Sequence, residues 1–465
     1  MRSLTSLHPP TLRANILSTV LARTWVVRYI KGYARERIID VLRKSIQTGN
    51  LIIKDSDEKG ILEFGLADSA GTSVTLTVID PNMWVRIMFS NDLGVSEAYM
   101  NGEFEVTSLK GLLNLWLDNR KGLTAIETSI SGAFSRYSAL AINALGRQSL
   151  QVAQWNVEVA YNTSNTFFQT FLSKEMMYSC ALQWSDAEHG VRGDLTVGPT
   201  EGDLEAAQLR KIHTIIKKAR LRSGDRLLEI GSGWGAMSIE AARLGCTVDT
   251  VTLSSEQKAM TEERAKAAGV GDRVRVHLCD YRDLPASFEN TFDALITCEM
   301  IEAVGPRYMP EFFRVVNWAL KKERATVVIT STSRPEHRYT DYQADDFARH
   351  YHWPNSHLPS ATSLAVAVQD AVPGAFVLHN IEDHGPHYPR TLREWGRRFE
   401  KNFTGEVVEE LQQKHPQLRD EKALEAFRRK WRYLFIYAEV GFARAYATLN
   451  CWTFTRPENV AEVCA

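Results

Sequence analysis

Cysteine is scarce in this 465-residue sequence, and its placement excludes two common ways of holding a fold together. The six cysteines form no C-x-x-C pair and no cluster with histidine, which argues against a disulfide framework and a structural metal site. They are Cys180, Cys246, Cys279, Cys298, Cys451 and Cys464. Unpaired cysteines suit a reducing compartment, so we expect a cytoplasmic protein without a bound metal.

Long apolar runs are also absent. A membrane-spanning helix needs roughly 18 to 20 consecutive apolar residues, and the longest candidate, residues 16–30, is interrupted by Arg23 and Arg28. The sequence contains no secretory signal pattern. A formal net charge of −1 gives no indication of a nucleic-acid-binding surface. We therefore expect a protein that neither crosses a membrane nor binds nucleic acid.

Basic residues dominate the first part of the chain, where the first acidic residue is Glu36. Apolar residues such as Leu17, Leu21 and Trp25 recur among them at helical spacing. The pattern in residues 1–49 favours a basic amphipathic helix lying on anionic lipid, hence a peripheral membrane location. A helix packing on its own domain and a mitochondrial targeting peptide are the alternatives.

Residues 50–165 predict a smaller α+β domain. Short β-type runs at residues 51–53, 62–65 and 74–78 are separated by Asp, Gly and Ser. A helical pattern follows over residues 94–117, and residues 118–165 are weakly patterned, as in a linker.

Residues 166–465 alternate between strand and helix patterns. Strand-like runs lie at residues 226–230, 247–251, 274–278, 292–297 and 326–330, with helical stretches such as 235–244 and 255–268 between them. Strands separated by such helices predict a parallel sheet covered on both faces. A helical cap is expected over residues 391–448, and a last strand near residues 450–454. The expected fold is therefore α/β, a Rossmann-like sheet with a helical cap.

A glycine-rich turn follows the first of these strands, in the sequence Leu227-Leu228-Glu229-Ile230-Gly231-Ser232-Gly233-Trp234-Gly235. Glycines at the carboxyl end of a strand let the backbone turn tightly and approach a ligand. Nicotinamide dinucleotides use the spacing G-x-G-x-x-G, so a dinucleotide enzyme is an alternative, although residue 236 is Ala. Glu229, before the glycines, favours S-adenosylmethionine (SAM), whose methionine end it would position.

The next two strand ends carry groups suited to the same ligand. Thr252 and Leu253 end the second strand, and Gln257 lies in the following turn, where the ribose hydroxyls would lie. Asp280 and Tyr281 end the third strand and place a carboxylate and an aromatic ring beside the adenine. Three successive strand ends with suitable groups favour a single binding site. Together these features predict a class I SAM-dependent methyltransferase sheet.

In the order of its motifs the sequence resembles the cyclopropane-fatty-acyl-phospholipid synthase family, which includes mycolic-acid cyclopropane synthases and related lipid methyltransferases. The resemblance covers residues 50–456. Its motifs lie at residues 92–102, 178–181, 228–236, 251–257, 280–283, 302–306, 358–360 and 385–392. It implies transfer of a one-carbon unit from SAM to the double bond of an unsaturated phospholipid acyl chain, at a membrane surface, by an enzyme that can form a homodimer.

Roles for individual residues also follow from the resemblance. The expected SAM-binding residues are Tyr178, Ser179, Glu229, Gly231, Gly233, Thr252, Leu253, Gln257, Asp280 and Tyr281. Of these, Tyr178 and Ser179 would close over the methionine part. Cys180, Glu302 and Tyr388 match positions around a bound bicarbonate, which such enzymes use as the base that removes a proton.

Three positions depart from the family pattern around that anion. Ala303 follows Glu302 where the family has histidine, residues 329–332 lack another expected histidine, and Ala438 replaces a cysteine. The enzyme then either still forms a cyclopropane ring or has changed to plain methylation of an alkene, an amine or a small specialised metabolite. A SAM-binding protein without activity is a third alternative.

Two further groups of residues allow two interpretations each. A histidine could replace the missing base or be a core or surface residue, and the candidates are His337, His350, His352, His357, His379, His384 and His387. Basic residues interleaved with aromatic ones in the late helices would seat a phospholipid headgroup, or form an ordinary charged outer face. They are Arg393, Arg397, Arg398, Lys401, Arg428, Arg429, Lys430 and Arg432.

Overall fold

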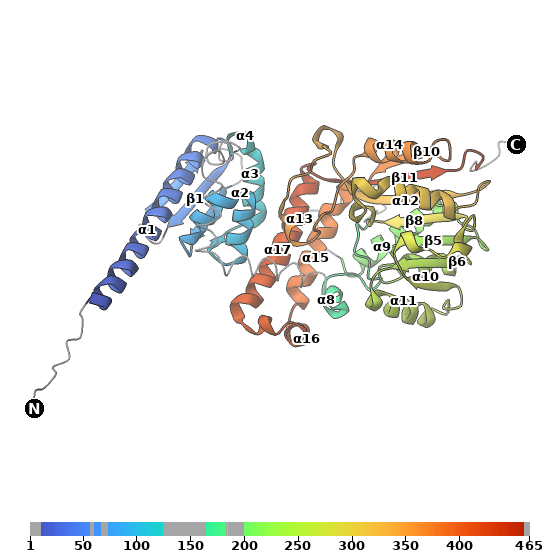
Figure 1. The fold of residues 1–465 in the computed structure, drawn as a ribbon, viewed down its shortest axis with the longest axis horizontal. Coiled ribbons are helices and arrows are strands. Elements are labelled where there is room, and N and C mark those ends of the chain that lie inside the picture. Colours follow the sequence, from blue (N-terminus) through green and yellow to red (C-terminus); the bar gives the residue numbers. More distant parts are fainter. Residues whose placement is uncertain are drawn as a thin grey trace, which may run out of the picture. The chain divides into compact units, whose positions relative to one another are not determined.

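The computed structural model describes residues 11–55, 60–66, 73–123, 164–182, 184 and 200–459, with side chains from residue 28 onward (Figure 1). Two compact units divide the chain. The N-terminal unit comprises Met1–Val152 with Lys422–Tyr433, and the C-terminal unit comprises Ala153–Glu421 with Leu434–Ala465. The domain boundaries expected at residues 49 and 165 stay predictions.

The described part of the N-terminal unit contains a four-stranded sheet in the order β2-β1-β3-β4. Its strands are β1 (Asn50–Asp55), β2 (Gly60–Gly65), β3 (Ser73–Val78) and β4 (Phe104–Val106), and its helices are α1 (Thr11–Ser45), α2 (Asn82–Met100), α3 (Leu109–Asp118) and α4 (Arg120–Leu123). β1 pairs antiparallel with β2 and parallel with β3. Val74, Leu76 and Val78 alternate inward along β3 and are buried, as a half-buried strand requires.

One helix expected in this unit is divided. The pattern over residues 94–117 predicts a single helix, but α2 ends at Met100 and β4 precedes α3. Gly102 adopts a φ of 68°, which suits a residue just beyond a helix end. Ser108 then caps α3 by accepting a hydrogen bond from the Gly111 N–H at 2.9 Å. The prediction was wrong because Gly102 ends one helix and Ser108 begins the next. The residues between them form β4, in which Phe104 pairs with Val78 of β3.

The later part of α1 packs on the N-terminal unit. Ala34, Ile38 and Leu42 are buried, and Arg35 donates from Nε to the buried Asp55 at 2.8 Å. The side chains of residues 11–27, on which the expected lipid contact depends, lie outside the described residues. Membrane association therefore stays a prediction.

A seven-stranded sheet in the order β10-β11-β9-β8-β5-β6-β7 forms the C-terminal unit. Its strands are β5 (Arg226–Ile230), β6 (Thr247–Thr252), β7 (Val274–Leu278), β8 (Ala294–Cys298), β9 (Thr326–Ser333), β10 (Val377–Asp383) and β11 (Thr448–Thr455). β5 to β9 pair in parallel, and β11 runs antiparallel to both β9 and β10.

Helices cover this sheet, and a further group of helices, including α15 and α16, forms the cap (Figure 1). The α-helices are α8 (Asn165–Gln169), α9 (Asp203–Lys218), α10 (Ala236–Arg243), α11 (Ser255–Ala267), α12 (Gly305–Ala319), α13 (Phe347–Tyr351), α14 (Ala361–Ala371), α15 (Tyr388–Asn402), α16 (Gly405–Lys414) and α17 (Glu421–Ala443). The 3-10 turns are η1 (Tyr281–Asp283), η2 (Ala286–Phe288), η3 (Ile301–Ala303), η4 (Glu336–Arg338), η5 (Gly385–His387) and η6 (Pro416–Arg419).

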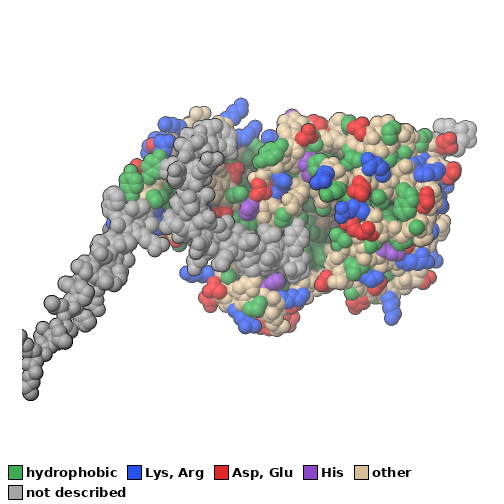
Figure 2. Space-filling view, viewed as in Figure 1, with side chains coloured by type: hydrophobic (Ala, Val, Ile, Leu, Met, Phe, Trp, Pro, Cys, Tyr) green, Lys and Arg blue, Asp and Glu red, His purple; other side chains and the backbone are tan. Residues whose placement is uncertain are grey.

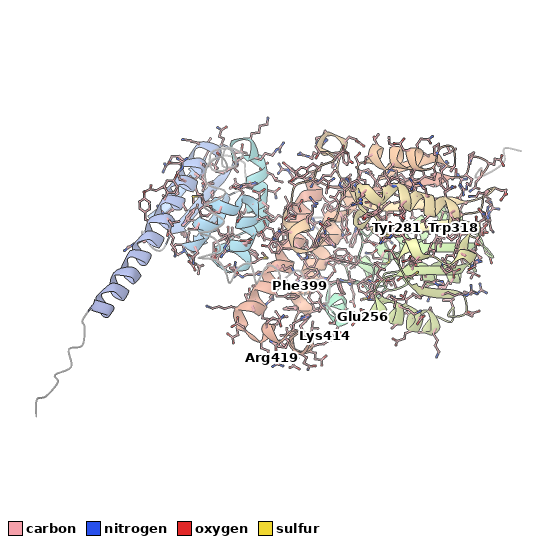
Figure 3. The ribbon with its side chains drawn as sticks, viewed as in Figure 1. Glu256, Tyr281, Trp318, Phe399, Lys414 and Arg419 are labelled. Carbon is pink, nitrogen blue, oxygen red and sulfur yellow. The ribbon has the colours of Figure 1, made fainter. Side chains whose placement is uncertain are left out.

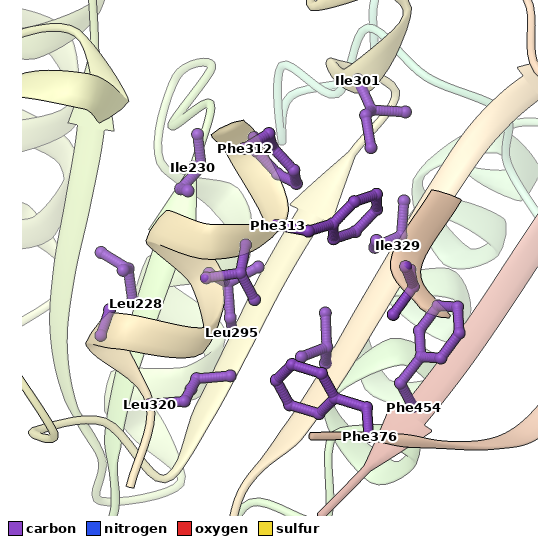
Figure 4. Close-up of a cluster of buried hydrophobic side chains, with 14 of the residues drawn as sticks. Leu228, Ile230, Leu295, Ile301, Phe312, Phe313, Leu320, Ile329, Phe376 and Phe454 are labelled. Carbon is purple, nitrogen blue, oxygen red and sulfur yellow. The ribbon is translucent and has the colours of Figure 1, made fainter. Parts of the chain in front are cut away.

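Two hydrophobic cores cover the two faces of the sheet. Leu227 packs with residues of α9, α10 and α11, whereas its neighbour Leu228 packs with residues of α12 and α14. Figure 4 shows the second core, where Phe312 and Phe313 of α12 lie over the strands. Each fully buried side chain of this size stabilises the fold by roughly 1.5–3 kcal/mol. With both faces covered, the carboxyl edge of the parallel strands is left for a ligand.

Aromatic packing holds the cap together. Phe399 of α15 (Figure 3) lies edge-on to Phe167 of α8 at a ring-centroid distance of 6.0 Å and to Phe435 of α17 at 5.9 Å. Phe399 and Phe167 are fully buried. The cap is thus an aromatic core rather than a loose cover.

The α/β class with a cap and a smaller α+β unit is confirmed. β5 and β7 have the expected bounds. β10 was not predicted, because Val377, Leu378 and Ile381 do not alternate with polar residues as in a half-buried strand, and the structure leaves all three exposed. Within the described ranges, no helix is long and apolar enough to cross a membrane, and no group of acidic, histidine or cysteine side chains is placed to hold a metal. Basic and acidic side chains are interspersed on the face of the C-terminal unit in Figure 2.

Candidate active site

The glycine turn connects β5 to α10 and leaves one side of its backbone open. Gly231 and Gly233 adopt φ values of 94° and 48°, in the region that favours glycine. The N–H of Gly231 donates to the Val251 carbonyl at 3.0 Å, which fixes the turn against β6. A Cβ on Gly231 would lie 3.3 Å from Met300, and one on Gly233 would meet nothing within 4 Å. A ligand can therefore approach this backbone closely.

Glu229 fixes the structure behind the turn. Its carboxyl Oε2 accepts hydrogen bonds from the Ser238 hydroxyl on α10 and from the Thr250 hydroxyl on β6, the latter at 2.8 Å. Burial raises the pKa of Glu229 to about 7, partly offset by these two hydrogen bonds. The side chain ties three elements together and so sets the shape of the turn.

The ends of β6 and β7 present the other groups expected to bind SAM. The Thr252 hydroxyl donates to Gln257 Oε1 at 2.8 Å, and Leu253 is 75% exposed. Asp280 accepts from Arg282 on both oxygens at 2.8 Å, and Tyr281 (Figure 3) packs edge-on against Phe312 at 5.2 Å. Thr252 is buried, whereas Gln257, Asp280 and Tyr281 are partly exposed. Together with the exposed Leu253 and the open glycine backbone, these polar and apolar groups fit a nucleoside with a methionine tail.

A second cluster of polar groups centres on Glu299, just after β8. Its Oε1 accepts a hydrogen bond from the Cys180 backbone N–H at 2.9 Å, and its Oε2 accepts one from the Tyr388 hydroxyl at 2.5 Å. Thr391, one turn further along α15, donates from its hydroxyl to the His387 carbonyl at 3.3 Å and accepts from the Ala181 N–H at 3.2 Å. Cys180 is fully buried, and burial raises its thiol pKa well above the usual value.

A buried cation accompanies this carboxyl group. Lys211 on α9 is 1% exposed, and its Nζ donates to the Ser179 hydroxyl. Burial raises the pKa of Glu299, while Lys211 and the two hydrogen bonds oppose that rise. The site thus holds one positive and at least one negative group away from bulk water.

Glu302 follows in the turn η3. Its Oε1 accepts from the Thr332 N–H at 2.6 Å, and its Oε2 is buried. Removal from water raises the pKa of Glu302 to about 8, and the charge of Glu299 adds to the rise. At neutral pH Glu302 is therefore largely protonated.

Aromatic rings line the same cluster. Tyr178 lies 5.4 Å from Trp395 and 6.4 Å from Trp353 between ring centroids. Tyr388 lies 6.2 Å from Trp395 and 4.2 Å from Phe442. Rings of this kind exclude water and present π faces that stabilise a cation by roughly 0.5–2 kcal/mol.

Bicarbonate does not fit between the donors expected to hold it. The Cys180 N–H and the Tyr388 hydroxyl both donate to Glu299, so neither is left for a second anion. The structure brings Cys180 and Tyr388 together at Glu299, and Glu302 lies near enough to Glu299 for their charges to interact. The roles assigned to these residues, and to the SAM-binding residues, stay predictions.

Sequence analysis missed Glu299, Lys211 and Thr391. Glu299 lies three residues before Glu302 in the segment 298–302, at the end of an expected strand, so a second carboxylate at the same sheet edge was the available signal. Lys211 carried no signal, because it reaches the cluster from a helix remote in sequence, whereas Thr391 lies within the motif at residues 385–392 that also contains Tyr388.

The candidate histidines and arginines have other contacts. His357 donates its backbone N–H to the Glu302 carbonyl at 2.9 Å, and burial lowers the pKa of His387 to about 4, which keeps it neutral. Arg393 pairs with Glu439 at 2.8 Å, and Arg398 pairs with Glu205 at 2.7 Å. Because these two arginines form ion pairs with carboxylates of the protein, they offer less charge to a lipid headgroup at the late helices.

The seven-stranded sheet and its glycine turn define a class I SAM-dependent methyltransferase fold. Among solved structures, a cyclopropane synthase of Mycobacterium tuberculosis is similar with a TM-score of 0.51 and 22% identity, over 65% of this chain and 97% of that one. Coclaurine N-methyltransferase is similar with a TM-score of 0.55 and 16% identity, over 78% of this chain and 99% of that one. At these identities the likeness shows the fold.

The chain belongs to the mycolic acid cyclopropane synthetase family, whose model matches residues 148–452. Tuberculostearic acid methyltransferase of Mycobacterium tuberculosis is 31% identical over 378 residues, which are 78% of this chain and 79% of the relative. Cyclopropane-fatty-acyl-phospholipid synthase of Escherichia coli is 31% identical over 337 residues, which are 72% and 79% of the two chains. The family resemblance is confirmed, and the protein is a SAM-dependent methyltransferase of this family.

Proposed function

We propose that this enzyme transfers the methyl carbon of SAM to the double bond of an unsaturated fatty acyl chain of a phospholipid. The observation that carries the proposal is a water-poor cluster of carboxyl groups and aromatic rings around Glu299, within the unit that holds the glycine turn. Methyl transfer to an alkene leaves a carbocation, which water would trap, so the site must exclude water. A base must then remove a proton after the methyl transfer.

Each part of the cluster has a role in such a reaction. SAM, when bound, supplies an electrophilic methyl group. Gly231 and Gly233 would let the backbone approach its methionine part, and Tyr178 would close over it. The rings of Tyr178, Tyr388 and Trp395 would keep water from the electron-deficient carbon that the alkene becomes.

Two family members support a fatty acyl acceptor by the names they carry. One is named for a cyclopropane fatty acyl phospholipid product and the other for tuberculostearic acid. Related chains are also named as sphingolipid methyltransferases, for example sphingolipid C9-methyltransferase A of Emericella nidulans, 28% identical over 64% of this chain and 53% of that one. A lipid, rather than a particular headgroup, is therefore what these names share, and the two fatty acid names favour an acyl chain as the acceptor.

The test uses purified enzyme, unsaturated phospholipid vesicles and SAM with a trideuterated methyl group, followed by mass spectrometry of the released fatty acids. Vesicles of saturated phospholipid are the control. A product that gains one carbon with two deuterium atoms indicates ring or methylene formation, and three deuterium atoms indicate plain methylation. No incorporation into any unsaturated chain would contradict the proposal and favour a small-metabolite acceptor or a SAM-binding protein without activity.

A further inference from the structure

Two hydrogen-bond donors from separate segments converge on Glu299. The Cys180 N–H comes from the loop after α8, and the Tyr388 hydroxyl comes from the first turn of α15. Each donates to a different carboxyl oxygen. Two donors on two oxygens suit an ionised carboxylate, which accepts hydrogen bonds on both.

The backbone of Glu299 is strained. Its φ is 49°, in the left-handed region that glycine adopts easily and other residues rarely do. Such a conformation costs roughly 1–3 kcal/mol and persists where the surrounding structure enforces it. The Glu299 N–H donates to the Thr330 carbonyl at 2.8 Å, which holds the strained residue against β9.

The charges around Glu299 favour one negative group in the cluster. Burial raises the pKa of Glu299, and the positive charge of the buried Lys211 opposes that rise. Burial raises the pKa of Glu302, and the negative charge of Glu299 raises it further, because a second negative charge would lie beside the first. The two hydrogen bonds to Glu299 and the nearby Lys211 therefore favour the negative charge on Glu299 rather than on Glu302.

We propose that the Glu299 carboxylate takes the place of a bound anion and is itself the proton acceptor, so that catalysis does not require bicarbonate. A carboxylate has the charge and the planar pair of oxygens that bicarbonate would offer, and it occupies the two donors expected for that ion. The proposal rests on the proposed function for its chemical step, whereas the filled anion site does not depend on it.

The proposed step balances. The alkene π pair forms a C–C bond to the methyl carbon as the C–S bond breaks, which leaves S-adenosylhomocysteine and a carbocation on the acyl chain. A C–H bond of the new one-carbon unit then breaks. Its electron pair closes the ring or forms a C=C bond, after a 1,2-hydride shift in the second case, and its proton passes to a Glu299 oxygen and later to solvent.

Two variants separate this role from a structural one. Glu299→Gly removes the carboxylate and suits the φ of 49°, so we expect equal or higher thermal stability together with a loss of turnover of roughly 10²- to 10⁴-fold. Glu299→Gln keeps the shape and cannot accept the proton, so we expect a similar loss. Glu289→Gln, at an exposed position, is the matched control and should keep the wild-type rate.

Bicarbonate is then supplied or withheld in the trideuterated SAM assay, and its binding is measured separately by NMR with ¹³C-bicarbonate. We expect the wild-type rate not to change with bicarbonate and no binding to the wild type. Glu299→Gly should bind bicarbonate at the vacated donors and regain part of its activity, whereas Glu299→Gln should do neither.

A wild-type enzyme that binds bicarbonate or needs it for turnover would overturn the proposal, as would full activity of Glu299→Gln. If the wild type modifies no unsaturated chain, the proposed function fails. The NMR measurement needs no acyl substrate and still decides whether Glu299 fills the anion site, so the two failures are distinguishable.

Discussion

The two halves of the sheet's carboxyl edge are organised differently. At the ends of β5, β6 and β7, part of the group expected to bind SAM can be reached by a ligand, with open space at Gly233 and an exposed Leu253. After β8 and β9 the polar groups form hydrogen bonds with one another, and Glu299 accepts from both the Cys180 N–H and the Tyr388 hydroxyl. The first half, at β5 to β7, is the open half and is preorganised to receive a ligand. The second half, after β8 and β9, is the closed half, and in our proposal Glu299 supplies its anion. This contrast separates features common to the methyltransferase fold from features that set the chemistry of this chain.

Apart from the Glu299 variants, the largest effect is expected for a substitution in the glycine turn of the open half, which should weaken the binding of SAM. Gly231→Val places a β-branched side chain at a φ of 94° and against Met300, and strain of roughly 1–3 kcal/mol should weaken SAM binding roughly 10- to 100-fold by calorimetry. Gly374→Val is the control, since Gly374 has a φ of 69° and open space around it. Equal loss of affinity in both variants would show that general strain, and not the turn, is responsible.

On the closed half, Tyr388→Phe should slow turnover without affecting SAM affinity. The change removes the hydroxyl that donates to Glu299 and keeps the ring beside Phe442. A hydrogen bond to a charged group contributes roughly 1.5–3 kcal/mol, so kcat should fall about tenfold or more. Tyr342→Phe, at an 81% exposed position, should leave both values unchanged. A weaker affinity for SAM with normal kcat would instead place Tyr388 in the open half.

The open half was largely predictable from the sequence because its features are local. Glu229 lies within β5 and Gly231 follows it directly, Thr252 ends β6, and Asp280 lies just beyond the end of β7. Strand periodicity and parallel topology place such residues at one edge without knowledge of side-chain contacts.

The closed half was predictable only through the family resemblance, and then only in part. Cys180 and Tyr388 meet at Glu299 from segments far apart in the chain, and no local pattern encodes that convergence. The positive φ of Glu299 depends on tertiary packing as well. The departures at Ala303 and Ala438 were visible in the sequence, but the carboxylate that fills the anion site was not.

Lys211→Met should shift the pH dependence of turnover. Lys211 lowers the pKa of Glu299, so its removal raises that pKa and leaves more of the base protonated at a given pH. The acidic limb of kcat should move to higher pH, with a loss of a few-fold near neutrality. Lys217→Met, exposed on the same helix α9, is the control and should leave the profile in place. An unchanged profile for Lys211→Met would remove Lys211 from the electrostatics of the base.

The smallest effect on activity is expected for Glu302→Gln. Because the pKa of Glu302 is raised to about 8, the group is already neutral near pH 7, and glutamine can still accept from the Thr332 N–H. Turnover at neutral pH should change by less than the few-fold loss expected for Lys211→Met, since no base is lost. A loss as large as that of Glu299→Gln would make Glu302 the base and remove the difference between the two carboxyl groups.

Stability supplies a second measurement for Glu302→Gln. The folded state of the wild type binds a proton at Glu302 up to about pH 8, whereas the unfolded state releases it near pH 4.5. Its contribution to the free energy of unfolding is therefore complete below pH 4.5 and is lost as the pH rises through that window. Glutamine does not titrate, so its thermal stability relative to the wild type should increase as the pH rises from about 6 to about 9. A constant difference across that range would mean that Glu302 is ionised throughout, and that the closed half holds two negative charges instead of one.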